Sequence, residues 1–200
     1  MGDTKERILQ TALRLFAQRG YEAVSVSDIG EALGMTKGAL YRHFGSKRDI
    51  FDSILRRMER QDGEQARDHD LPEGTAETDG AAYETATAAD IVSFSKAMFR
   101  YWTEDPFAAP FRRMLTVEQY RSAEMGRLYG QYLSAGPLGY VADLFRALGL
   151  SDPERRAAAF YGPMFLLYSV YDGAENKAAV TALLDEYMDR AEKELRGGKL

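Results

Sequence analysis

The sequence predicts an all-α fold in two parts: an N-terminal three-helix domain that contains a helix-turn-helix, and a larger C-terminal helical domain. Every strong apolar repeat along the chain has the spacing of a helix, and no alternating strand pattern stands out. Glycines and capping residues divide residues 1–60 into short helical segments. A chain of 200 residues with 45% apolar content is long enough for a small domain beside a larger one.

The N-terminal segments are bounded by residues typical of helix ends. The first segment ends near Gly20, because glycine tolerates the positive φ that often follows a helix. Ser25, followed three residues later by Asp28, predicts a capped start for the second helix. Gly34 makes the turn, and Thr36 caps the third helix. Two short helices around a tight glycine-containing turn form a helix-turn-helix, which we place at residues 25–44.

Residues 61–90 break the helical pattern. Apart from alanines, Leu71 and Tyr83 are the only large apolar side chains of this segment, and Pro72 interrupts any period. Such a segment buries too little surface to offset the entropy lost on ordering. We therefore expect a mobile loop over residues 61–90.

The helical pattern returns at Asp90 and continues to the last helix, whose apolar positions run over residues 180–195. Proline and glycine pairs and capping residues set the expected boundaries. The sequence predicts breaks at Asp105-Pro106, Gly136-Pro137 and Gly149, helices over 118–133 and 138–148, and a helix start at Ser151-Asp152-Pro153-Glu154.

The composition excludes several kinds of site. Without cysteine there are no disulfides, thiolate zinc sites or cysteine nucleophiles, and His43 and His69 are the only histidines. No glycine-rich phosphate loop or nucleophile elbow occurs, so we predict no enzyme activity, no metal and no cofactor. The longest uncharged apolar-rich run, residues 157–171, is shorter than a membrane span and contains Pro163. A polar start and the absence of cysteine favour a cytoplasmic protein.

The net charge of −5 argues at first against a nucleic-acid partner, but the charge is unevenly distributed. Residues 1–60 carry 11 basic and 8 acidic side chains, whereas residues 61–90 carry 1 and 9, and residues 91–200 carry 14 of each. The N-terminal part is therefore mildly basic, which permits DNA binding.

The second helix of the helix-turn-helix has the chemistry of a major-groove helix. Gly38 and Ala39 are small, so the backbone can approach base edges and thymine methyl groups. Lys47, at the start of the next helix, can reach a phosphate. The candidate DNA contacts are Ser27, Thr36, Lys37, Gly38, Ala39, Tyr41, Arg42, His43 and Lys47.

Residues 4–58 resemble the DNA-binding domain of the TetR family of bacterial regulators. The resemblance lies in Ala12 and Phe16, in Arg19-Gly20-Tyr21, in Ser25-Val26-Ser27-Asp28-Ile29, and in Thr36-Lys37-Gly38-Ala39-Leu40-Tyr41-Arg42-His43-Phe44-Gly45-Ser46-Lys47. Two positions depart from the family pattern. Gly30 stands where the family often has alanine, which costs the helix about 1 kcal/mol. Arg42 stands where an aromatic or other polar residue is common, so whether its partner is a base or a phosphate is open.

The resemblance implies a DNA-binding domain at residues 1–47 and a ligand-binding and dimerisation domain at residues 48–200. It implies a homodimer, formed by the run at 157–171 and the last helix, on a near-palindromic double-stranded operator. A small-molecule effector would release the DNA, and repression is the family's usual outcome. By position, Ser27 and Thr36 would lie near the groove, and Tyr41, His43 and Lys47 would hold the backbone.

Aromatic residues of the second domain are candidates to line an effector pocket. Such a pocket would be largely apolar with several phenols, suited to an aromatic or amphipathic ligand. Aromatic stripes at helical spacing are more often plain core, and Pro163 could shape a pocket or simply be tolerated by packing. The candidates are Phe94, Met98, Tyr101, Trp102, Tyr129, Tyr140, Phe165 and Tyr168.

Two other functions compete with a DNA-binding regulator: a helical small-molecule-binding protein without DNA function and, less favoured, an enzyme that uses the aromatic residues. Lys37 and Arg42 discriminate between them, because their replacement would abolish DNA affinity only in a regulator. His43 neighbours Phe44, so packing against the core is as good an interpretation as a DNA contact.

Overall fold

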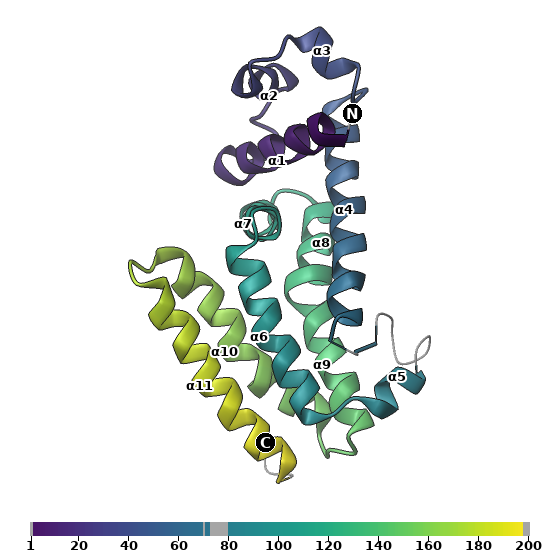
Figure 1. The fold of residues 1–200 in the computed structure, drawn as a ribbon, viewed down its shortest axis with the longest axis vertical. Coiled ribbons are helices and arrows are strands. Elements are labelled where there is room, and N and C mark those ends of the chain that lie inside the picture. The colour runs from purple at the N-terminus through teal and green to yellow at the C-terminus, as the bar shows by residue number, and fades with distance from the viewer. Residues whose placement is uncertain (1, 70, 73–79, 198–200) are drawn as a thin grey trace. The chain divides into compact units, whose positions relative to one another are not determined.

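The structure is a computed structural model that describes residues 2–69, 71–72 and 80–197 (Figure 1). These residues form eleven helices and no strand, which confirms the predicted all-α class. The helices are α1 (Gly2–Arg19), α2 (Val26–Leu33), α3 (Lys37–Tyr41), α4 (Lys47–Arg67), α5 (Gly80–Thr85), α6 (Ala88–Glu104), α7 (Ala108–Glu118), α8 (Ala123–Leu133), α9 (Ala135–Ala147), α10 (Pro153–Gly173) and α11 (Lys177–Arg196).

The chain folds into two compact units that do not follow its sequence order. The first unit is Met1–Gln61 with Asp105–Tyr129, and the second is Asp62–Glu104 with Gly130–Leu200. The first unit therefore contains α7 as well as the N-terminal helices. The predicted division at residues 47 and 48 concerns function rather than compactness and stays a prediction.

The first unit is built around α1, which packs against both α2 and α7 (Figure 1). Apolar side chains that are far apart in the sequence share its core. Those that are fully buried include Ile8, Phe16, Ile29, Leu40, Ile50, Phe51 and Phe111. Burying a side chain of this size stabilises a fold by about 1.5–3 kcal/mol, so this core holds the helix-turn-helix together.

The predicted helix ends in the first unit are confirmed. Ser25 and Asp28 form a capping box, in which the Asp28 amide donates to Ser25 Oγ at 3.1 Å and Asp28 Oδ2 accepts from the Ser25 amide at 2.7 Å. The Thr36 hydroxyl accepts from the Ala39 amide at 3.2 Å. Gly20 and Gly34 have φ of 86° and 65°, the left-handed conformation that favours glycine.

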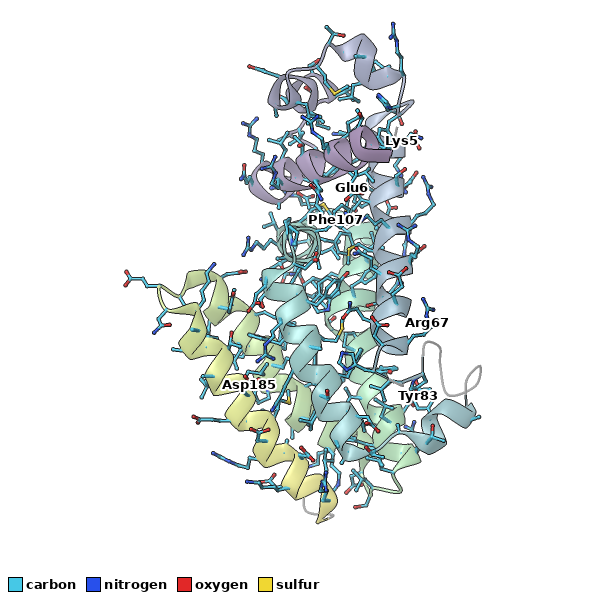
Figure 2. All side chains as sticks on the ribbon, viewed as in Figure 1. Lys5, Glu6, Arg67, Tyr83, Phe107 and Asp185 are labelled. Carbon is cyan, nitrogen blue, oxygen red and sulfur yellow. The ribbon has the colours of Figure 1, made fainter. Side chains whose placement is uncertain are left out.

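The second unit is a helical bundle in which α10 packs against α9 and α11, and α11 packs against α6 (Figure 1). Two ion pairs, one helical turn apart, join α6 to α11. Lys96 Nζ lies 2.5 Å from an Asp189 carboxylate oxygen, and Arg100 lies 2.6 Å from Asp185, which Figure 2 labels. Equal spacing on both helices fixes how α6 and α11 are aligned along their length.

The expectation of a loop over residues 61–90 is wrong for much of the segment. Helix α4 continues to Arg67, and α5 and the start of α6 also fall within it. Sparse apolar residues suffice here, because Leu71 and Tyr83 are both buried and the Tyr140 hydroxyl donates to the Pro72 carbonyl at 2.9 Å. Residues 70 and 73–79 lie outside the described residues, and mobility stays a prediction.

Two other expected boundaries also differ. The break expected at Gly136-Pro137 falls at Ser134, because proline is tolerated in the first turn of α9. The helix expected from Glu118 begins at Ala123, and Glu118 instead ends α7. The breaks at Asp105-Pro106 and Gly149 are confirmed, the latter with a φ of 74°.

Candidate nucleic-acid interface

Most of the predicted contact residues are exposed to solvent, on α3 and on the segments beside it. Leu40 is fully buried and anchors this five-residue helix to the core of the first unit. The exposed predicted residues are Ser27, Thr36, Lys37, Gly38, Tyr41 and Arg42, and those half-buried are Ala39, His43 and Lys47. Tyr41 is 44% exposed, and Lys37 Nζ lies 5.9 Å from the centre of its ring. One surface therefore combines two cations with a phenol, a combination suited to phosphates and base edges.

Gly30, one departure from the family pattern, has a structural explanation. A Cβ placed on Gly30 would lie 2.9 Å from the Met35 carbonyl oxygen, which is closer than real Cβ atoms come. The Met35 amide in turn donates to the Gly30 carbonyl at 2.8 Å. Glycine is thus required because the turn after α2 passes directly over this position.

Gly38 has no comparable explanation within the fold. A Cβ at Gly38 would meet no atom within 4 Å, and Gly38 is not among the glycines with positive φ. Glycine inside a helix is nevertheless less favourable than alanine by roughly 0.5–1 kcal/mol. The fold alone therefore does not explain why residue 38 lacks a side chain.

Lys47 makes contacts inside the protein that the sequence does not reveal. Its Nζ donates to the carbonyls of Tyr21 at 2.9 Å and Glu22 at 3.3 Å, and it lies 4.3 Å from the centre of the Tyr21 ring. Lys47 thereby ties the start of α4 to the loop between α1 and α2. Its predicted phosphate contact stays a prediction, and these bonds compete with it.

Sequence reasoning missed Glu118, which contacts the same loop from α7. The Tyr21 amide donates to Glu118 Oε1 at 3.1 Å, although the two residues are 97 positions apart. Glu118 is only 1% exposed and lies 3.6 Å from the Arg121 guanidinium. A signal was present, because Glu118 continues the helical spacing of the buried Phe111 and Leu115, where a carboxylate is unusual.

Charged side chains also join α4 to the C-terminal part of the first unit. Arg48 donates to both carboxylate oxygens of Glu124, at 2.6 and 2.8 Å, and to Asp52 at 2.7 Å. These hydrogen bonds raise the pKa of Arg48 and lower the pKa of Glu124. All three groups are substantially exposed, so the bidentate geometry contributes more to orientation than to stability.

A second contact of α4 involves Arg57. Its guanidinium lies 3.6 Å from the centre of the Phe107 ring and pairs with Glu6 at 2.6 Å. Figure 2 labels Glu6 on α1 and Phe107, the residue before α7. Arg57 therefore links α1, α4 and the start of α7 within the first unit.

The predicted effector residues are dispersed. Met98, Tyr101, Trp102 and Tyr168 are buried in the second unit, and Phe94 and Tyr140 are half-buried there. Tyr129 belongs to the first unit, and Phe165 on α10 is 39% exposed. Tyr168 stacks on Phe99 at 5.4 Å, which is ordinary core packing, so the ligand-binding role of these eight residues stays a prediction.

Within the described ranges, no three histidine or acidic side chains are grouped so that they could hold a metal ion. No helix of that same part combines the length and apolarity needed to cross a membrane.

The fold combines an N-terminal helix-turn-helix domain with a helical domain. Comparisons with known proteins match this architecture. Residues 8–54 match the model of the bacterial regulatory proteins of the tetR family. The chain is 44% identical over 62 residues to the HTH-type transcriptional regulator AcrR of Shigella flexneri. The matched residues make up 31% of this chain and 29% of AcrR. The chain thus spans less than a third of the curated relatives it matches.

Solved structures match over nearly the whole chain. A transcriptional regulator of the TerR/AcrR family from Aquifex aeolicus VF5 has a TM-score of 0.66 and 18% identity, covering 94% of this chain and 98% of that chain. The SmeT–triclosan complex has a TM-score of 0.63 and 16% identity, covering 94% and 90%. Residues 8–54 thus carry the domain of the tetR family, and the solved structures show that the whole chain has the fold of such regulators. These relatives are named as regulators, in agreement with the prediction of no enzyme activity.

Proposed function

We propose that the protein is a cytoplasmic transcriptional regulator that binds a near-palindromic DNA operator through α3 as a homodimer. A small apolar or aromatic ligand releases it from the operator, so that it acts as a repressor. The family and the name of its relative AcrR support regulation of transcription. The repressor role and the class of ligand rest on the resemblance of residues 4–58 to the TetR family.

The observation that carries the DNA-binding role is the unexplained glycine at position 38. Glycine there weakens α3, yet the protein itself leaves the space beside it open. A backbone without a side chain is useful where a bulky partner must approach closely, as base edges do in the major groove. The exposed cations Lys37 and Arg42 flank this position and favour a polyanionic partner.

The proposed dimer is supported by an exposed apolar stripe on the second unit. Leu166 and Val170, one turn apart on α10, are 63% and 44% exposed, and Leu183 on α11 is 55% exposed. No charged residue occurs in the run 157–171, so α10 can pack against a second copy without burying a charge. A symmetric dimer that binds a near-palindromic operator requires its two copies of α3 to reach major grooves about 34 Å apart, or a multiple of it.

The proposed effector site lies among the aromatic residues of the second unit. The ring centres of Tyr101 and Trp102 on α6 lie 5.3 Å apart, and the ring centre of Trp102 lies 6.3 Å from that of Tyr132 on α8. The fold neighbour SmeT is known in complex with triclosan, which is a precedent for a small-molecule ligand on this fold. Such a ligand lowers DNA affinity only if it binds better to the conformer that does not fit the operator.

The first test is selection of DNA from a random-sequence pool, followed by fluorescence anisotropy of the selected site with scrambled DNA as competitor. The proposal predicts saturable, competitor-resistant binding with two protomers or more per site, weakening steeply as salt rises. A selection that yields no preferred sequence would contradict the regulator function. It would favour a helical small-molecule-binding protein without DNA function.

A further inference from the structure

We propose that Glu118 is a positioning residue for the recognition helix, and that it joins α7 to the helix-turn-helix. This inference rests on the proposed function, because it concerns how the DNA-contacting surface is held. Glu118 lies far from α3 in the sequence and is absent from the predicted DNA contacts. It acts through the loop between α1 and α2.

Just after the end of α1, the backbone amide of Tyr21 donates to Glu118 and not to a carbonyl of the helix. The Gly20 amide donates to the Phe16 carbonyl at 2.9 Å, as expected after a helix that ends in a left-handed glycine. In the alternative Schellman motif the next amide, here that of Tyr21, would bond to the Phe16 carbonyl. Glu118 accepts the Tyr21 amide instead, at 3.1 Å.

Gly20 also makes room for this carboxylate. A Cβ at residue 20 would lie 2.7 Å from Glu118 Oε1 and 3.0 Å from the Arg121 side chain. A buried carboxylate is costly unless it is hydrogen-bonded and paired, and Glu118 has both the Tyr21 amide and Arg121 as partners. The position of α7 is thereby tied to a particular geometry of the α1–α2 loop.

The Tyr21 peptide is held from its other side by α4. Its carbonyl accepts from Lys47 Nζ at 2.9 Å, and its ring lies 5.1 Å from both Phe16 and Phe51. Four residues later the chain reaches Ser25, the N-cap of α2. The start of α2 is thus fixed relative to α7 and α4, and the tight turn after α2 carries that placement to α3.

The test separates reach from charge with two conservative variants. Glu118→Gln keeps an oxygen acceptor at the same distance but loses the charge, whereas Glu118→Asp keeps the charge but is one methylene shorter. Glu59→Gln, at an exposed residue of α4, is the control for the change in charge. Hydrogen exchange of the Tyr21 amide and operator affinity are measured at a temperature where circular dichroism shows each variant fully folded.

We expect Glu118→Asp to speed exchange of the Tyr21 amide and to weaken operator binding by about tenfold, the size of one lost hydrogen bond to a charged group. Glu118→Gln should stay within about threefold of the wild type, because the acceptor remains. Wild-type affinity in Glu118→Asp, or a loss confined to Glu118→Gln, overturns the proposal. A wild-type protein that binds no selected DNA refutes the proposed function instead, and the exchange rates still report on the hydrogen bond.

Discussion

Helices α3 and α10 both carry exposed surfaces with a glycine, yet their chemistry is opposite. Helix α3 has five residues, and Lys37 and Tyr41 within it and Arg42 at its end are exposed around Gly38. Helix α10 has 21 residues, and its exposed stripe around Gly162 includes Leu166 and Val170. A short polar surface suits a charged partner, whereas a long apolar surface suits another apolar surface.

The two surfaces differ in the force that would hold their proposed partners. Binding through α3 releases counterions from DNA and weakens as salt rises. Association through α10 depends on burial of apolar area, which moderate salt leaves nearly unchanged. The two surfaces can therefore be perturbed separately, although dimeric binding to an operator requires both.

The largest expected effect is on the apolar surface. Leu166→Glu places a charge in the middle of the stripe, and burying an unpaired charge is costly. We expect the dimer dissociation constant to rise by about a hundredfold or more, with a matching loss of operator affinity. Sedimentation velocity measures the first and anisotropy the second. Lys193→Glu, at an exposed residue near the end of α11, is the control, and a Leu166→Glu variant as dimeric as this control would contradict the proposed interface.

An effect of about tenfold is expected on the polar surface. Lys37→Ala should weaken operator binding and reduce the slope of log affinity against log salt by about 1, as loss of one phosphate contact does. Lys47→Ala should lower thermal stability more than the salt slope, because Lys47 Nζ already donates to the Tyr21 carbonyl. Anisotropy at several salt concentrations compares the two variants. Equal losses of slope would mean that Lys47 leaves its internal partners to contact phosphate.

The smallest expected effect is on pH dependence. Hydrogen bonds from Ser25 lower the pKa of Asp28, and Arg48 lowers the pKa of Glu124. Each group binds protons less tightly when folded, so its contribution is present above the usual carboxyl pKa of about 4 and is lost as the pH falls below it. Urea unfolding from pH 7 to pH 3 should show a shallower loss of stability for Asp28→Asn than for Glu59→Gln. Identical pH profiles would contradict this assignment.

The boundaries of α2 and α3 could be predicted from the sequence, because the residues that set them act locally. Ser25, Asp28, Thr36 and Gly34 set helix ends through bonds within four residues, so their spacing alone places α2 and α3. Those bonds form wherever the chain folds into helices, without help from distant residues.

What the sequence did not predict depends on distant contacts. Glu118 meets Tyr21 across 97 residues, and Lys47 turns toward the same loop instead of remaining free. The helical parts of 61–90 were missed because two buried side chains, Leu71 and Tyr83, outweigh a polar composition. The aromatic candidates could not be sorted, because helical spacing is the same for core and pocket residues.

Whether α3 is shaped for a DNA partner is tested most directly by Gly38→Ala, compared with two matched glycine variants. Gly139→Ala, in α9, also adds a methyl group to open space, whereas Gly30→Ala places one against the Met35 carbonyl. Free energy of unfolding and operator affinity are measured for all three variants.

We expect Gly38→Ala and Gly139→Ala each to gain about 0.5–1 kcal/mol of stability, and Gly30→Ala to lose stability. Only Gly38→Ala should gain stability while losing operator affinity, by about tenfold or more. A Gly38→Ala variant that is more stable and binds the operator as tightly as the wild type would contradict the claim that position 38 is kept small for DNA.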